Sequence, residues 1–330
     1  MYFLLRIYLI FVYVCRCHYT NIELVYMKKN FCLKVFLSFL AFSLGCSLSA
    51  DAKSFVKKTE GDLYTITCGN AVMTVNPAQG SKIVSLTLDG KEVLAQHKSP
   101  FNNNDYGATF WPSPQSNWNW PPIATYDRNP YTVVDDTKSL VCVSGLDSKY
   151  PYRFTKEFIA DAKRGCFEII YSIKNESDAD VSVAPWEISR VPGAGLIAIG
   201  AEKEYIHPLD VMPFQFSDGV AWIPFEPSPK QRKAFFNGSG WLAFVNNGIL
   251  FLKTFPDVDF GMTAPEQEEE EVYINENTTF IELENQGEYV LLAPGASLDW
   301  TVRWSVSYVN ESEPGTALKA EIDKQLKKHK

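Results

Sequence analysis

From residue 60 onward the chain alternates apolar and polar residues with a period of two, the pattern of half-buried β-strands. Turn signals separate some of these segments, such as Asp89-Gly90 and Asn246-Asn247-Gly248, whose residues tolerate positive φ angles. The alternating segments are LYTITC, AVMTV, KIVSLTL, KEVLA, YRFTKEFIA, FEIIYSIKN, VSVAPWEISRV, WLAFV, ILFLKTF, FIELE, YVLLA and SLDWTVRWSVSYV. Because no segment before residue 314 has a helical period, the sequence predicts an all-β protein of many short strands joined by hairpins.

The C-terminal residues depart from this pattern. Leu318, Ile322 and Leu326 are spaced four apart among charged residues between positions 317 and 330. This spacing predicts a short C-terminal helix with one apolar face lying on the sheet. His329 falls at the frayed end of that helix and is set aside as a site residue.

The N-terminal residues have the layout of a secretory signal peptide. Lys28 and Lys29 precede an apolar run at 35–45, and small residues follow at 50–52 as in an A-x-A-like cleavage site. The apolar run is too short to span a bilayer comfortably. We therefore expect residues 27–52 to be a signal peptide and the protein to be secreted or periplasmic.

Translation is then expected to begin at Met27, with residues 1–26 as an upstream extension; a membrane-anchoring role for these residues is the alternative. Cys46 follows a glycine as in bacterial lipoproteins, so a lipid anchor there is a second alternative. Residues 53–330 are expected to form a single domain without a membrane span, and their oligomeric state stays open.

Charge narrows the range of partners. The whole chain carries a formal charge of −8, and residues 53–330 contain 26 basic and 37 acidic residues, which argues against nucleic acid and anionic lipid as partners. The run EQEEEE at 266–271 would repel itself, so we expect a solvated loop there. A calcium site is disfavoured because its ligands must be spaced around a turn.

No cofactor or metal is predicted. The sequence has no phosphate-binding loop, no dinucleotide fingerprint and no zinc-protease motif. Cys68, Cys142 and Cys166 follow residue 52 without a C-x-x-C pair, so a zinc site and a disulfide framework are unsupported, although one disulfide stays open.

Residues 108–122, ATFWPSPQSNWNWPP, hold three tryptophans and four prolines and predict a stiff aromatic loop. An indole can stack on the apolar face of a sugar ring, and polar side chains such as Gln115 and Arg190 can pair with its hydroxyls. Trp111, Trp118 and Trp120 could form the floor of such a site. If this segment alternates as a strand does, the side chains of Trp118 and Trp120 point to the same side. Burial of these indoles in the core is the competing interpretation.

Three segments, taken in order, resemble the galactose mutarotase-like (aldose 1-epimerase-like) superfamily, and more narrowly a bacterial secreted family of unknown function within it. They are QGSKIVSLTLDGKEVL, GATFWPSPQSNW, and LENQ followed by LLAPGASLDWTVRW. The resemblance covers roughly residues 60–310. It implies a large antiparallel β-sandwich, the supersandwich of that superfamily.

The resemblance also implies a catalytic base. In aldose epimerases the glutamate of the closing motif takes the proton from the anomeric hydroxyl while a histidine protonates the ring oxygen. The matching glutamate is Glu284 in LENQ, with Gln286 at the family's spacing. Glu282 shares its face by alternation but does not match the motif.

The family's histidine has no counterpart, because Ala184, Pro185, Trp186 and Glu187 stand where it should be. Glu187 is the alternative acid, if burial raises its pKa. It could equally accept a sugar hydroxyl in a site without turnover. His207 would neighbour the site if residues 205–210 match a "Y-x-P-x-D" segment of the family, although a structural role is its other interpretation.

Three functions therefore stay open at this point. One is an isomerase-type enzyme working on sugars through carboxylate acid/base chemistry. A second is a non-catalytic carbohydrate-binding protein with the tryptophans as its floor. The third is a structural envelope protein whose aromatic residues are core.

Overall fold

The structure is a computed structural model that describes residues 55–96, 106–208, 211–276 and 280–330. The predicted signal peptide, the upstream extension and the lipid-anchor position Cys46 lie outside the described residues. Within the described part of the chain, the helices are too short or too polar to span a membrane.

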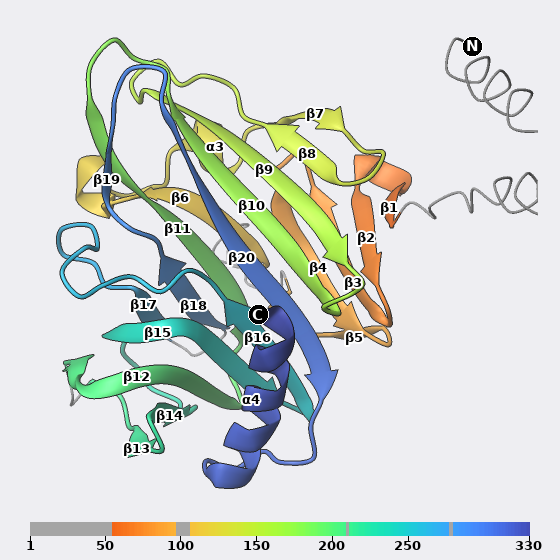
Figure 1. The fold of residues 1–330 in the computed structure, drawn as a ribbon, viewed down its shortest axis with the longest axis vertical. Coiled ribbons are helices and arrows are strands. Elements are labelled where there is room, and N and C mark those ends of the chain that lie inside the picture. The colour runs from red at the N-terminus through yellow and green to blue at the C-terminus, as the bar shows by residue number, and fades with distance from the viewer. Residues whose placement is uncertain (1–54, 97–105, 209–210, 277–279) are drawn as a thin grey trace, which may run out of the picture. The chain divides into compact units, whose positions relative to one another are not determined.

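Antiparallel strands dominate the described residues, as the two-residue period predicts (Figure 1). The strands are β1 (Val56–Lys58), β2 (Tyr64–Cys68), β3 (Ala71–Asn76), β4 (Lys82–Leu88), β5 (Lys91–Glu92), β6 (Ala108–Ser113), β7 (Thr132–Asp135), β8 (Leu140–Val143), β9 (Tyr152–Asp161), β10 (Cys166–Asn175), β11 (Val181–Pro192), β12 (Leu196–His207), β13 (Gln215–Ser217), β14 (Val220–Pro224), β15 (Arg232–Asn246), β16 (Ile249–Thr254), β17 (Glu270–Ile274), β18 (Phe280–Gln286), β19 (Val290–Leu292) and β20 (Ser297–Tyr308). The helical elements are η1 (Glu60–Asp62), η2 (Gln115–Asn117), α3 (Ala124–Asp127) and α4 (Thr316–His329).

The strands form a β-sandwich, as the sequence predicts. One layer contains the ladder β9–β10–β20–β16, and the other contains β6–β11–β18–β17. The long strand β15 belongs to both, because it pairs with β16 along its second half and with β17 along its first half. Aromatic rings join the layers: Phe110 of β6 stacks on Tyr171 of β10 with centroids 4.1 Å apart and meets Phe154 of β9 at 5.1 Å.

The predicted turns are present. Asp89 and Gly90 have φ angles of 48° and 75° between β4 and β5, and Asn247 and Gly248 have 51° and 72° between β15 and β16. These left-handed pairs match the twist of two antiparallel strands. The turn residues therefore set the register of both hairpins.

The predicted C-terminal helix is α4. Its residues Leu318 and Ile322 are fully buried against an apolar cluster contributed by β12, β14, β15 and β16. His329 is not frayed, contrary to the sequence-based expectation: it is buried, and its Nδ1 lies 2.9 Å from Oγ1 of Thr254. Burial lowers the pKa of His329 to about 4, so this histidine is neutral near pH 7.

Two sequence-based assignments of local structure are wrong. The first half of the predicted aromatic loop is the buried strand β6. Prolines disfavour strands, but Pro112 lies directly opposite Pro185 of β11, so neither missing N–H breaks a bond between these two strands. The acidic run is a loop only in its first half: Glu266 is exposed and Glu268 is partly exposed, whereas Glu269, Glu270 and Glu271 are fully buried at the start of β17.

The three cysteines of the described chain, Cys68, Cys142 and Cys166, are buried free thiols. Burial raises the pKa of Cys166 to about 12 and also raises the pKa of the other two, which keeps the thiols protonated. They are packing residues of the sandwich.

Candidate functional site

One face of the layer β6–β11–β18–β17–β15 brings four of the nine predicted site residues together: Trp111, Arg190, Glu284 and Gln286. Residues directly opposite one another in antiparallel strands point to the same side of a sheet. The registers place three rows of such residues across these strands: Trp111, Trp186 and Gln286; Thr109, Ile188, Glu284 and Glu271; and Arg190, Glu282, Tyr273 and Lys233. We call this surface the site face.

Glu284 occupies the middle row. Its Oε2 accepts hydrogen bonds from the indole N–H of Trp186 at 3.0 Å and from Nζ of Lys233 at 3.1 Å. Only 1% of Glu284 is exposed. Burial raises the pKa of Glu284 to about 8; Lys233 opposes the rise and the nearby Glu271 carboxyl adds to it. A glutamate with such a pKa can exchange a proton near neutral pH.

Lys233 joins two carboxyl groups. Its Nζ lies 2.5 Å from Oε2 of Glu271 and 3.1 Å from Oε2 of Glu284. Burial opposes the charge on Lys233, but the two carboxylates outweigh that effect and raise the pKa of the lysine. The amide of Gln286 donates to Oε1 of Glu271 at 2.9 Å and fixes its orientation. Glu284 and Glu271 therefore share one cation and differ in their second partner, which is Trp186 for Glu284 and Gln286 for Glu271.

Arg190 lies on the same face, one row away. Its Nη2 is 2.7 Å from Oε1 of Glu282, and its guanidinium carbon lies 5.8 Å from the ring centre of Trp111. Glu282 and Glu284 thus share a face, as alternation predicts, but Glu282 is held by an arginine. Burial raises the pKa of Glu282, and Arg190 opposes this effect.

The three tryptophans of residues 108–122 behave differently from one another. Trp111 and Trp118 are buried, and their indole N–H groups donate to Oδ1 of Asp127 and to the carbonyl of Pro112, each at 2.8 Å. Trp120 is 63% exposed and meets Trp111 edge-on with centroids 6.3 Å apart. Alternation does not relate Trp118 to Trp120, because the chain between β6 and these residues turns through η2. Trp120 is therefore the indole that this segment offers to a ligand.

Glu187, the predicted partner of Glu284, is not on the site face. It points into the sandwich, where Oε1 accepts from the Tyr171 hydroxyl at 2.6 Å and Oε2 lies 2.8 Å from Nζ of Lys253. The Trp304 indole also donates to Oε2 at 3.2 Å, and no part of Glu187 is exposed. The structure does not bring Glu187 and Glu284 together, because neighbouring strand residues of β11 and β18 alternate between faces.

His207 and Gln115 lie toward opposite ends of the site face. His207 ends β12; its ring stacks on Phe235 at 5.4 Å, and its Nε2 lies 3.3 Å from Oε1 of Glu268. Gln115 begins η2, beside Trp118, and is partly exposed. The described residues contain no group of three or more His, Cys, Asp or Glu side chains placed to hold a metal ion.

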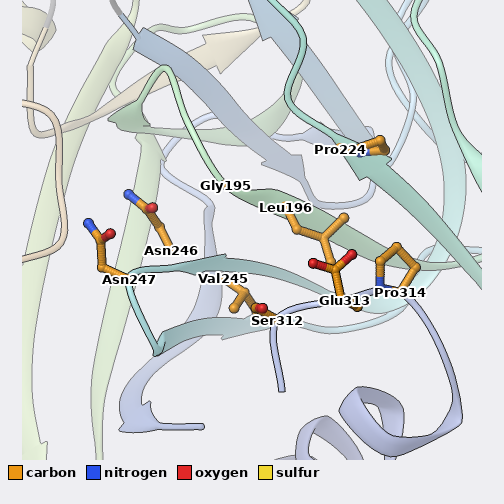
Figure 2. Close-up of a pocket in the computed structure, with 9 residues that line it drawn as sticks. All are labelled: Gly195, Leu196, Pro224, Val245, Asn246, Asn247, Ser312, Glu313 and Pro314. Carbon is orange, nitrogen blue, oxygen red and sulfur yellow. The ribbon is translucent and has the colours of Figure 1, made fainter. Parts of the chain in front are cut away.

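A depression of about 290 Å³ lies away from the site face, between the β15–β16 turn and the residues before α4 (Figure 2). Asn246, Asn247 and Glu313 line it. It contains none of the residues predicted to form the site, so the sugar hypothesis does not rest on it.

The fold is that of galactose mutarotase-like proteins. The chain superposes with a TM-score of 0.55 and 15% identity on a protein from Escherichia coli K12 provisionally assigned as an aldose 1-epimerase, over 75% of this chain and 99% of that one. It is also similar to a galactose mutarotase-like protein from Lactobacillus casei ATCC 334, with a TM-score of 0.52 and 12% identity over 74% of this chain and 100% of that one. A galactose mutarotase-like protein from Clostridium acetobutylicum superposes with a TM-score of 0.51 and 10% identity over 75% of this chain and 95% of that one. No protein-family model and no curated protein matches the chain.

Sequence reasoning missed two charged residues of the site face, Glu271 and Lys233. Glu271 was hidden in a run of acids, and Lys233 precedes the segment WLAFV without a motif of its own. The apolar alternation of Val272 and Ile274 directly after the acids was the available sign that β17 continues the sheet.

Proposed function

We propose that this protein acts on carbohydrates at the anomeric centre, with Glu284 as the general base. The observation that carries the proposal is the contact of Glu284 with Lys233 and Trp186 on a sheet face that also holds Glu271. The fold similarity to mutarotase-like proteins supports a sugar as the ligand.

Opening a pyranose ring requires one group that removes the proton of the anomeric hydroxyl and one that donates to the ring oxygen. Both oxygens are bonded to the same carbon, so two neighbouring side chains can reach them. In this proposal Glu284, when ionised, takes the hydroxyl proton. The Lys233 ammonium, which is 27% exposed, donates a hydrogen bond to the ring oxygen, and Glu271 keeps that lysine charged.

Carbohydrate binding without turnover is the second candidate function. It is favoured by the burial of Glu284 and by the absence of a histidine among Ala184, Pro185 and Trp186, where the resembling family has its acid. Trp111 and Trp118 are accounted for by packing, so Trp120 carries the binding interpretation.

The substitution Glu284→Gln separates the two functions. Catalysis predicts an anomer-exchange rate at least about 10²-fold lower, with sugar affinity and folding nearly unchanged, the scale of losing a general base. Anomer interconversion would be followed by NMR over a panel of free sugars. The matched control is Glu168→Gln, because Glu168 of β10 forms an ion pair with Arg303 of β20 away from the site face. Unchanged exchange in Glu284→Gln would refute the base assignment.

Export remains part of this proposal and rests on the layout of residues 27–52 alone. It predicts a mature N-terminus near Lys53. Mass spectrometry of the native protein would detect it, and a stable species retaining residues 1–26 would contradict the upstream extension.

A further inference from the structure

The site face continues beyond the carboxyl pair. Lys233 lies 5.3 Å from the ring centre of Trp186 and 5.6 Å from that of Phe235, so it links the two rings. Phe235 in turn lies nearly parallel to His207, with an interplanar angle of 11°. The side chain of His207 is 57% exposed. An accessible ring therefore ends the face at β12.

The other end of the face is also aromatic and accessible. Trp120 contacts Trp111 of β6, and Trp111 meets Trp186 of β11 with centroids 5.3 Å apart. From β6 to β12 the face crosses β11, β18, β17 and β15, which at the usual strand spacing is about 24 Å. That distance is several times the width of one pyranose ring.

The charges on this face are paired with one another. Arg190 is bound by Glu282, and Lys233 is bound by Glu271 and Glu284. An acidic sugar would have to compete with these carboxylates for either cation. The face is therefore suited to hydroxyl groups, which can accept from the partly exposed Lys233 while the ion pairs stay intact.

We propose that the ligand of the site face is an uncharged oligosaccharide, with its end rings on Trp120 and on the Phe235–His207 pair and an inner ring at the exposed part of Lys233. This inference rests on the proposed function, because it assumes that the face binds a sugar. Stacking on accessible aromatic rings at both ends makes affinity depend on chain length.

The test is calorimetric titration with unmodified gluco-, manno- and xylo-oligosaccharides, each series running from the monosaccharide to the hexasaccharide. Affinity should rise with length by at least about tenfold, corresponding to about 1.4 kcal/mol. Trp120→Ala and His207→Ala should each weaken binding of the longest bound chain by about tenfold, a larger loss than either variant causes for the monosaccharide. Tyr308→Ala, at the exposed end of β20, is the matched control.

The outcomes are distinguishable. Equal affinity for monosaccharide and hexasaccharide, with both variants silent, would overturn the oligosaccharide inference and leave the proposed function standing. Tighter binding of uronic-acid or sulfated chains would overturn the assignment of an uncharged ligand. If Glu284→Gln and the wild type bind no sugar of any length, the proposed function fails as well.

Discussion

Lys233 is the residue on which the electrostatics of the site face depend. It is the common partner of Glu271 and Glu284, and its charge lowers the pKa of Glu284 against the effect of burial. Removing one partner of a buried ionic group leaves the other charge uncompensated, which is costlier than losing a surface pair.

Lys233→Met is therefore expected to destabilise the protein by about 3 kcal/mol at pH 8. The loss should shrink toward pH 5, because Glu284, whose pKa is raised by burial, is then protonated and no longer needs the lysine. Chemical denaturation at both pH values measures this. Lys319→Met, which breaks the exposed pair with Asp323 on α4, should cost less than about 0.5 kcal/mol at either pH. Equal losses for the two variants would contradict the role of Lys233.

The LENQ motif singled out Glu284 in the sequence, and in the structure the Glu284 carboxylate contacts the Trp186 indole and the Lys233 ammonium. Glu187 shows the limit of such reasoning. Its neighbours Tyr171, Trp304 and Lys253 are close only because the two layers fold over each other, and nothing local in the sequence predicts that contact. Because neighbouring residues of a strand point to opposite faces, alternation within β11 could have shown that Glu187 and Trp186 lie on different faces. Trp186 is the one that lies on the face of Glu284.

Strand β17 carries its acids into the protein interior. Glu269, just before it, accepts from the backbone N–H groups of Gly238 at 2.9 Å and Val258 at 3.3 Å. Burial raises the pKa of Glu269 to about 8 and the pKa of Glu270 well above its ordinary value, with Asp257 adding to both effects. These carboxyls keep their protons in the folded protein at neutral pH.

Stability should consequently fall as pH rises from about 6.5 to 8, by about 2 kcal/mol for the Glu269 carboxyl, and Glu270 acts in the same direction. The unfolded chain has already lost these protons above pH 4.5, so folding takes protons up and rising pH disfavours it. His329, whose folded pKa is lowered, opposes this trend only below pH 6.5. Glu269→Gln should remove about 2 kcal/mol of the fall in denaturation measurements. A variant with the wild-type pH dependence would contradict the protonated state of Glu269.

Strands with regular alternation, such as β9, β10 and β20, could be predicted from the sequence because each has one face toward the core. β6 and the acidic start of β17 could not be predicted in this way. In β6 the prolines hid a strand whose partner supplies another proline, and in β17 the acids hid residues that are buried as protonated or ion-paired groups. Both strands take their identity from tertiary partners, and both contribute to the site face.

Across the whole molecule, stability and catalysis make opposite demands on the buried carboxyls. The fold holds protonated carboxyls best at low pH, whereas a general base must be ionised to work. Both demands apply to Glu284, because burial raises its pKa to about 8. Under the proposed function, activity would rise over the same pH range in which stability falls.

The most direct test of the central claim is the pH dependence of anomer exchange by the wild-type protein, measured by NMR on a sugar shown to bind. If Glu284 is the general base, the rate should rise about tenfold per pH unit below an apparent pKa far above the ordinary 4.5 of a glutamate, and should level off above it. This rise should be absent in Glu284→Gln. Exchange no faster than the uncatalysed rate at every pH, with sugar binding retained, would contradict it.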